Sequence, residues 1–199
     1  MRLLLVRHGQ TAANVARRLD TARPGFDLTE VGREQAVALA HRLEHERLDA
    51  IYASDLVRTQ QTAAPLAATL GLGVVVLPGL REIQAGDYEM STDWGPYVET
   101  VATWHDDPTR AIPGGDSGVD FLTRYRRAIH RIAASGHERA VAVSHGAAIR
   151  VWCSFALDLP AGFLDGRRMD NTLVVTVEGD PDAGWRLLSW GDEPVPHDR

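Results

Sequence analysis

Two stretches of the chain place an uninterrupted apolar run directly before a histidine and a glycine. Residues 3–6 read Leu-Leu-Leu-Val and precede Arg-His-Gly at 7–9, and residues 141–143 read Val-Ala-Val and precede Ser-His-Gly at 144–146. Such runs are typical of strands buried on both faces of a parallel sheet. We therefore expect His8 and His145 at the carboxyl ends of two strands, the edge where open α/β sheets bind ligands.

Strand-like and helix-like segments alternate along the rest of the chain. Thr29 and the pair Ser54-Asp55 are candidate helix caps, and a glycine at 71 ends one apolar helical stripe. Further strands are expected at 49–53, 73–77 and 139–144, helices at 11–18, 29–46, 56–70 and 119–134, and a closing hairpin at 172–177 and 185–190. This alternation predicts a three-layer α/β/α sandwich with a mainly parallel central sheet.

One long segment interrupts this rhythm. Residues 84–117 are rich in glycine and proline and hold a single helical patch near 97–104, which is typical of a lid inserted over the functional edge of a sheet. We expect one domain over residues 1–199 that includes this lid. The tail, residues 193–199, has two prolines and no periodicity, and we expect it to be loose.

Composition narrows the function further. The net charge of −6 argues against nucleic-acid binding, which needs a basic surface. All 21 basic residues are arginine, which excludes lysine-based catalysis and leaves guanidinium groups as the binders of anions. Neither a secretory leader pattern nor an apolar run of about 18 residues is visible, so we expect a cytoplasmic protein without membrane contact.

No metal or cofactor is expected. Cys153 is the single cysteine, and His41 and His45, four residues apart, stand among charged neighbours without further metal ligands. The cluster Arg124, Arg126, Arg127 and Arg131 is interpreted as an exposed helix face. Positive charge for an anionic ligand must then come from arginines at the strand ends, and two histidines beside Arg7 favour a phosphoryl group.

Several blocks together resemble the signature of the histidine phosphatase superfamily, the phosphoglycerate mutase-like proteins. The blocks occur in the family's order and lie at 7–11 (Arg-His-Gly-Gln-Thr) with Asn14, at 28–32, at 54–63 around Arg58, at 80–82 (Leu-Arg-Glu), at 113–117, and at 144–146. The block after Glu82 departs from the family pattern, because Tyr88-Glu89-Met90 stands where Trp-Glu-Gly is common.

The resemblance implies a role for each matching residue. It makes His8 the nucleophile that becomes phosphorylated and Glu82 the proton donor. Arg7, Arg58 and His145 then complete the catalytic set by binding the phosphoryl oxygens, together with Asn14, Gly9 and Gly146. The helix start behind Gly9 is expected to supply backbone N–H groups to the same oxygens.

Three functions compatible with this resemblance are a phosphatase acting on a small phosphorylated metabolite, a cofactor-dependent phosphoglycerate mutase, and a non-catalytic binding protein. The binding protein ranks last because every catalytic position is filled. Residues 84–117 contain one basic residue, Arg110, against seven acidic ones, which suits a neutral or aromatic leaving group better than a second phosphate. We therefore expect a phosphomonoester hydrolase whose partner is a small molecule. The edge strand of the closing hairpin could pair with a second copy of the chain, so a homodimer is an open alternative.

Overall fold

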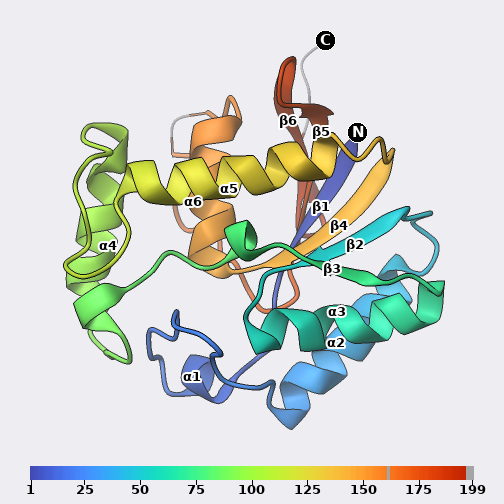
Figure 1. The fold of residues 1–199 in the computed structure, drawn as a ribbon, viewed down its shortest axis with the longest axis horizontal. Helices are drawn as coiled ribbons and strands as arrows, with labels where there is room; N and C mark the ends of the chain where they lie inside the picture. The colour runs from blue at the N-terminus through green and yellow to red at the C-terminus, as the bar shows by residue number, and fades with distance from the viewer. Residues whose placement is uncertain (161, 196–199) are drawn as a thin grey trace.

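The centre of the computed structural model, which describes residues 1–160 and 162–195, is a mixed sheet between two helical layers (Figure 1). Within the described residues the strand order is β3-β2-β4-β1-β5-β6-β7. Strands β3, β2, β4 and β1 are parallel, and β5, β6 and β7 continue the sheet antiparallel. The strands are β1 (Arg2–Arg7), β2 (Ala50–Ala53), β3 (Val74–Val76), β4 (Arg139–Ser144), β5 (Val174–Asp180), β6 (Gly184–Trp190) and β7 (Glu193–Pro194). The predicted three-layer α/β fold and the closing hairpin are confirmed.

Helices cover both faces of this sheet, which explains the continuous apolar strands. The helices are α1 (Ala12–Val15), α2 (Glu30–Leu43), α3 (Val57–Leu70), α4 (Gly95–Ala102), α5 (Gly118–Ala133) and α6 (Gly146–Ala156). In β1, Leu3 and Leu5 belong to the apolar core under α5 and α6, whereas Leu4 and Val6 belong to the core under α2 and α3. Because side chains alternate along a strand, burial on both faces requires an apolar residue at every position.

Strand register brings the two histidines together. Arg7 of β1 pairs with Ser144 of the parallel strand β4, so the next residues, His8 and His145, leave the sheet side by side. Behind His8 the chain crosses close to α2: a Cβ atom on Gly9 would lie 2.6 Å from the carbonyl oxygen of Gly32. Only glycine allows the strand end and the helix to approach this closely.

Several expected boundaries differ. Helix α1 covers only Ala12–Val15, and α3 begins after Leu56, which is the N-cap residue without any side-chain capping bond. Ser54 does not cap α3: its hydroxyl group accepts from the N–H of Leu56 at 3.2 Å, one residue before the helix begins, and is also hydrogen-bonded to a histidine in the site described below. The tail is more ordered than expected, since Glu193–Pro194 pairs with β6, while residues 196–199 lie outside the described residues.

The segment 84–117 forms a cover beside the carboxyl edge of the parallel strands, with α4 toward the left of the view (Figure 1). It contains short 3-10 helices at Gly86–Tyr88 and Thr103–His105 around α4. Met90 has a φ of +63°, a conformation that glycine adopts most readily, and its N–H donates to the carbonyl of Leu19 at 2.7 Å. Met90 therefore adopts a backbone conformation that is uncommon for a residue with a side chain.

Candidate active site

The imidazole rings of His8 and His145 form the centre of the site. Their centroids lie 5.2 Å apart, with an angle of 61° between the ring planes. His8 is 4% exposed and His145 is fully buried. The two strand ends thus present two imidazoles to one point, as their sequence positions predicted.

The hydrogen bonding and burial of His8 favour a neutral ring with one free nitrogen lone pair. Its Nδ1 lies 2.7 Å from the carbonyl oxygen of Gly9, and because a carbonyl only accepts, Nδ1 carries the proton and Nε2 keeps its lone pair. Burial lowers the pKa of His8 well below its usual value, and the positive charges of Arg58 and Arg7 lower it further. A neutral ring with a free Nε2 lone pair is the form that attacks an electrophile.

His145 is also held neutral, with its tautomer set by its neighbours. Arg58 donates to Nδ1 at 3.2 Å, so Nδ1 is the acceptor and Nε2 carries the proton, which it donates to Ser54 Oγ at 2.8 Å. Burial is the main cause that lowers the pKa of His145, followed by the charge of Arg58. Ser54 was not predicted as a partner of His145; the only sequence feature that pointed to it is the block at 54–63 in which it lies.

Arg58 and Arg7 both lie beside the histidines, and each is held by different hydrogen-bond acceptors. Arg58 is 2% exposed and donates to the side chain of Asp20 at 3.2 Å and to its carbonyl oxygen at 2.7 Å. Arg7 donates through one terminal nitrogen to the carbonyl of Met169, while its Nε is buried without a hydrogen-bond partner among the described residues. The unused N–H of Arg7 is available to an anion bound beside His8.

The carboxyl group of Glu82 lies against the first turn of α6, whose N-cap residue is His145. Its carboxylate accepts from the backbone N–H groups of Ile83 at 2.9 Å, Ala148 at 2.8 Å and Ala147 at 3.2 Å. Burial raises the pKa of Glu82, and these backbone hydrogen bonds oppose the rise because they favour the charged form. A buried carboxyl with a raised pKa is suited to donate and take up a proton near neutral pH.

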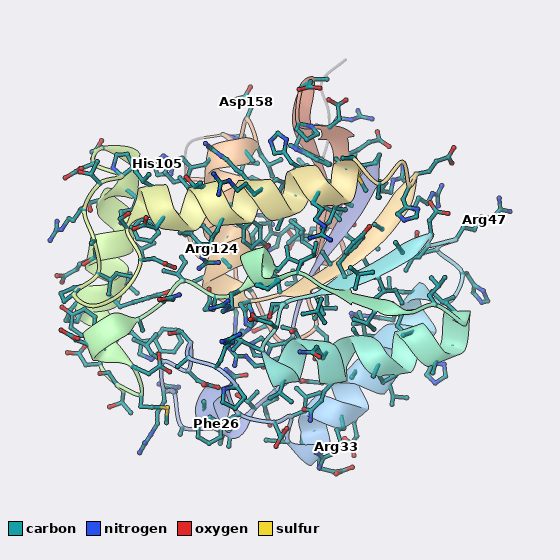
Figure 2. All side chains as sticks on the ribbon, viewed as in Figure 1. Phe26, Arg33, Arg47, His105, Arg124 and Asp158 are labelled. Atoms are coloured by element: carbon teal, nitrogen blue, oxygen red, sulfur yellow. The ribbon has the colours of Figure 1, made fainter. Side chains whose placement is uncertain are left out.

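Arg124 holds the segment that carries Glu82. It donates to the carbonyl oxygens of Arg81 at 2.8 Å and Glu82 at 2.6 Å and forms an ion pair with Asp116 at 2.7 Å. The interpretation of the arginine cluster as an exposed helix face holds for Arg126, Arg127 and Arg131, which are exposed. It was wrong for Arg124, because the fold brings the carbonyl oxygens of Arg81 and Glu82, more than forty residues away in sequence, to α5 (Figure 2).

Of the remaining residues predicted to bind phosphate, Asn14 and Gly146 line the cavity described below, whereas the N–H of Gly9 is already bonded within the protein. Asn14 faces the cavity described below, and its Oδ1 accepts from Thr11 and Asn171, which leaves its amide N–H groups for a ligand. Gly146 packs against Arg7, since an added Cβ would lie 3.3 Å from Arg7 Nε. The N–H of Gly9, in contrast, donates to Thr62 Oγ1 at 2.9 Å and is already used within the protein.

A cavity of about 470 Å³ opens from these groups toward α4 and α6. Its inner end is polar and its outer part is largely apolar. The lining residues are Arg7, His8, Asn14, Arg18, Leu19, Asp20, Arg58, Glu82, Trp94, Tyr97, Val98, Val101, Ala102, His105, Gly146, Ala147, Arg150, Val151, Ser154, Leu164 and Met169. The size is that of a pocket for a small organic ligand.

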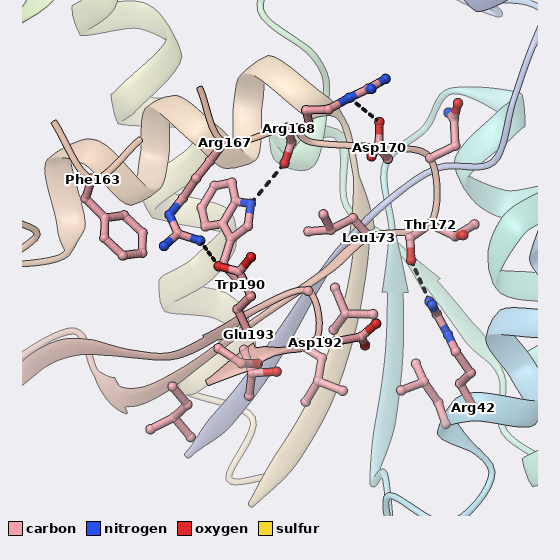
Figure 3. A pocket seen from close by; sticks show the side chains of 18 of the residues that line it. Arg42, Phe163, Arg167, Arg168, Asp170, Thr172, Leu173, Trp190, Asp192 and Glu193 are labelled. Carbon is pink, nitrogen blue, oxygen red and sulfur yellow. Dashed lines mark hydrogen bonds and ion pairs between the residues drawn. The ribbon is translucent and has the colours of Figure 1, made fainter. Parts of the chain in front are cut away.

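A larger cleft, of about 1340 Å³, lies elsewhere, between α2 and the loop before β5 (Figure 3). Residues that line this cleft are bonded to one another. Arg42 donates to the carbonyl of Thr172 at 2.7 Å, and Arg168 pairs with Asp170 at 3.1 Å. None of the predicted catalytic residues lines this cleft. The cavity that contains both histidines is therefore the candidate active site.

Neither a metal cluster nor a membrane span is found in residues 1–160 and 162–195. No group of three or more potential metal ligands occurs there, and no helix combines the length and apolar character needed to cross a bilayer.

Comparison with known proteins gives a consistent picture. A model of the histidine phosphatase superfamily (branch 1) matches residues 3–193. A PE-PGRS family protein of Mycobacterium tuberculosis is 38% identical over 96% of this chain, which spans 36% of that relative. A probable phosphoglycerate mutase, GpmB, of Proteus mirabilis is 32% identical over 96% of this chain and 93% of its own length. The structure of a mycobacterial glucosyl-3-phosphoglycerate phosphatase with VO3 superimposes with a TM-score of 0.80, at 34% identity over 96% of this chain and 98% of that one.

Proposed function

The chain belongs to the histidine phosphatase superfamily, and we propose that it hydrolyses small phosphate monoesters through a phosphohistidine formed at His8. The observation that carries the proposal is the state of His8: neutral, buried, with its Nδ1 proton bound to Gly9 and its Nε2 lone pair free beside Arg7 and Arg58. This arrangement supplies a nucleophile and the charge needed to hold a phosphoryl group at one point.

In the first step, His8 Nε2 attacks phosphorus and the bond from phosphorus to the ester oxygen breaks. Glu82, whose pKa is raised by burial, gives a proton to the departing alkoxide, which leaves as a neutral alcohol. Arg7 and Arg58 bind the equatorial oxygens, on which negative charge is spread in the transition state. The amide group of Asn14 adds a neutral donor.

In the second step, water attacks the phosphohistidine. The Glu82 carboxylate now takes the proton of the attacking water, and cleavage of the nitrogen–phosphorus bond restores the lone pair on His8. Inorganic phosphate leaves and Glu82 is protonated again. The same carboxyl group therefore serves as acid and then as base, which requires a pKa near the working pH.

His145 changes its hydrogen bonding when phosphate binds. In the structure, His145 Nδ1 accepts from Arg58. A phosphoryl dianion in the cavity favours the protonated ring, whose Nδ1–H then donates to a phosphoryl oxygen while Arg58 turns both terminal nitrogens to the ligand. His145 thus becomes a third cationic contact only when the anion is present.

The lid favours hydrolysis over mutase activity. A mutase must bind a second strongly anionic group and keep water away from the phosphorylated enzyme. The α4 residues that line the cavity, Tyr97, Val98, Val101 and Ala102, carry no positive charge. Phosphoglycerate mutase activity remains the alternative, and a non-catalytic binding role ranks last because His8, Glu82 and both arginines converge on one cavity.

The test is to trap the intermediate. Mixing enzyme with an aryl phosphate and quenching without acid should give an acid-labile, base-stable phosphoprotein, and His8→Ala should not form it. Phosphate release from the ester should exceed phosphoryl transfer between phosphoglycerates in a parallel mutase assay. Equal labelling of His8→Ala contradicts the nucleophile assignment, and dominant mutase turnover replaces hydrolase by mutase.

The cytoplasmic location, the single domain over residues 1–199 and the open question of a homodimer stay predictions from the sequence. Activity is expected without any metal or cofactor. The partner proposed for the site is a small-molecule phosphate ester.

A further inference from the structure

The outer part of the active-site cavity is an apolar passage between two helices. We call it the apolar arm and define it by Tyr97, Val98, Val101 and Ala102 of α4, Ala147 and Val151 of α6, and Leu164 and Met169 beside them. Tyr97 is 3% exposed, and Val101 and Val151 pack against the main core. The arm begins where Glu82 and Ala147 meet, which is where the ester oxygen of a bound substrate must lie.

Three further basic residues, Arg18, His105 and Arg150, line the same cavity outside the arm. Arg150 donates to the carbonyl oxygens of Arg167 and Leu164 and so fastens the loop before β5 to α6. His105 stacks on Phe155 at 4.0 Å between ring centroids, and Arg18 is exposed. The residues that define the apolar arm carry no charge, so a carboxylate or second phosphate placed against them would lose its hydration without gaining an ion pair with the arm, which is costly.

We propose that the alcohol part of the substrate is uncharged and apolar, an aliphatic or aromatic group that lies in the apolar arm between α4 and α6. The inference rests on the proposed function, because it places the phosphoryl group of the ester against His8. Apolar area removed from water along the arm then provides the selectivity. A glycerate-type ester, whose alcohol part carries a carboxylate, is a poor substrate by the same argument.

Straight-chain primary alkyl phosphates test this assignment. Their leaving-group basicity is nearly constant, so a change of kcat/KM with chain length reports binding of the chain. We expect kcat/KM to rise by about fourfold for each methylene that enters the arm, and to level off once the arm is full. 3-Phosphoglycerate should be hydrolysed more slowly than hexyl phosphate.

Two nearly isosteric variants locate the effect. Val101→Thr and Val151→Thr each put a hydroxyl group on the wall of the arm and should reduce the rise of kcat/KM from methyl phosphate to hexyl phosphate within the same variant. Val37→Thr is the matched control, because Val37 lies on α2 with 47% of its surface exposed. The control should keep the full dependence on chain length.

Binding of the same alkyl phosphates to His8→Ala, measured by calorimetry, separates the inference from the proposed function. Affinity that rises with chain length supports the arm even if turnover is lost. Hydrolysis of all esters at equal kcat/KM, or preference for 3-phosphoglycerate, would contradict binding of the alcohol part in the apolar arm but not the proposed hydrolase activity. Absence of phosphate release from every ester overturns the hydrolase, and binding that is independent of chain length then overturns the arm as well.

Discussion

The Nε2 atom of His145 lies 2.8 Å from the Oγ atom of Ser54, and both side chains are fully buried. Ser54 Oγ is in turn 2.9 Å from Thr59 Oγ1, whose hydroxyl group donates to the carbonyl of Leu56 at 2.7 Å. The Thr59 proton is thus used, so Ser54 donates to Thr59 and accepts from His145. This chain of hydrogen bonds fixes the proton of His145 on Nε2 and turns Nδ1 toward Arg58.

Ser54→Ala should therefore slow catalysis without touching the substrate. Loss of the acceptor lets the proton of His145 move between its nitrogens and leaves Nε2–H unsatisfied, which should reduce kcat by about tenfold. Because Ser54 acts through His145, the pH profile of kcat should also shift, as measured on an aryl phosphate.

Ser144→Ala is the matched control. Ser144 is equally buried, but its hydroxyl group donates to the carbonyl of Leu80 and accepts from Tyr125, with no bond to the His145 ring. Both variants should lose similar stability, and only Ser54→Ala should change the pH profile. Identical profiles for the two variants would show that Ser54 has a structural role only.

Gly32→Ala should destabilise the fold at the base of the site. A Cβ atom at residue 32 would lie 2.1 Å from the carbonyl oxygen of Gln10, a backbone atom that cannot move freely. We expect the free energy of unfolding to fall by about 1–3 kcal/mol in a urea titration. Gly73→Ala serves as control, since an added Cβ there meets no atom within 4 Å, and an equal loss in both would contradict the close-approach argument.

The sequence predicted where candidate side chains lie when residues next to one another in sequence determine their position. His8 and His145 could be placed because each follows a continuous apolar strand, and parallel strands end at one edge. The roles of Arg124 and Ser54 could not, because their partners are set by packing between segments far apart in the chain. Gly9 was expected to bind phosphate, but its N–H donates to Thr62 Oγ1. The two residues are far apart in sequence, so no local sequence pattern predicts this contact.

Acid should unfold the protein partly through these two histidines. Both have pKa values well below 6.5 in the folded state, so the unfolded chain binds more protons as pH falls. Their stabilising contribution is complete above about pH 6.5 and decreases below it, by up to about 1.4 kcal/mol per pH unit for each ring. The raised pKa of Glu82 acts in the opposite direction, because the folded state then holds the extra proton.

The slope of the free energy of unfolding between pH 8 and pH 5 checks this. His145→Gln should show a shallower decrease than the wild type, whatever its absolute stability, since Glu82 is common to both. His45→Gln is the control, as that side chain is 92% exposed. A slope that does not differ between His145→Gln and the wild type would contradict burial of a neutral ring.

Turnover should survive exhaustive chelation, because the arginines supply the charge that a metal would otherwise provide. Phosphate release is measured after dialysis against a chelator and compared with the untreated enzyme. A large loss that one divalent cation restores would contradict the mechanism.

Glu82→Gln separates proton transfer from positioning. Glutamine keeps the size and polarity of the side chain but delivers no proton, so phosphorylation of His8 by alkyl phosphates should fall by about 10²–10⁴-fold. An aryl phosphate with a good leaving group needs little protonation, and its phosphorylation step should suffer far less. Single-turnover measurement is required, because water attack in the second step needs Glu82 for every substrate.

Since the glutamine amide also loses part of the contact with Ala147 and Ala148, a common small decrease is expected for both esters. An equal large factor for alkyl and aryl phosphates in that step would assign Glu82 to positioning of α6 and not to proton transfer.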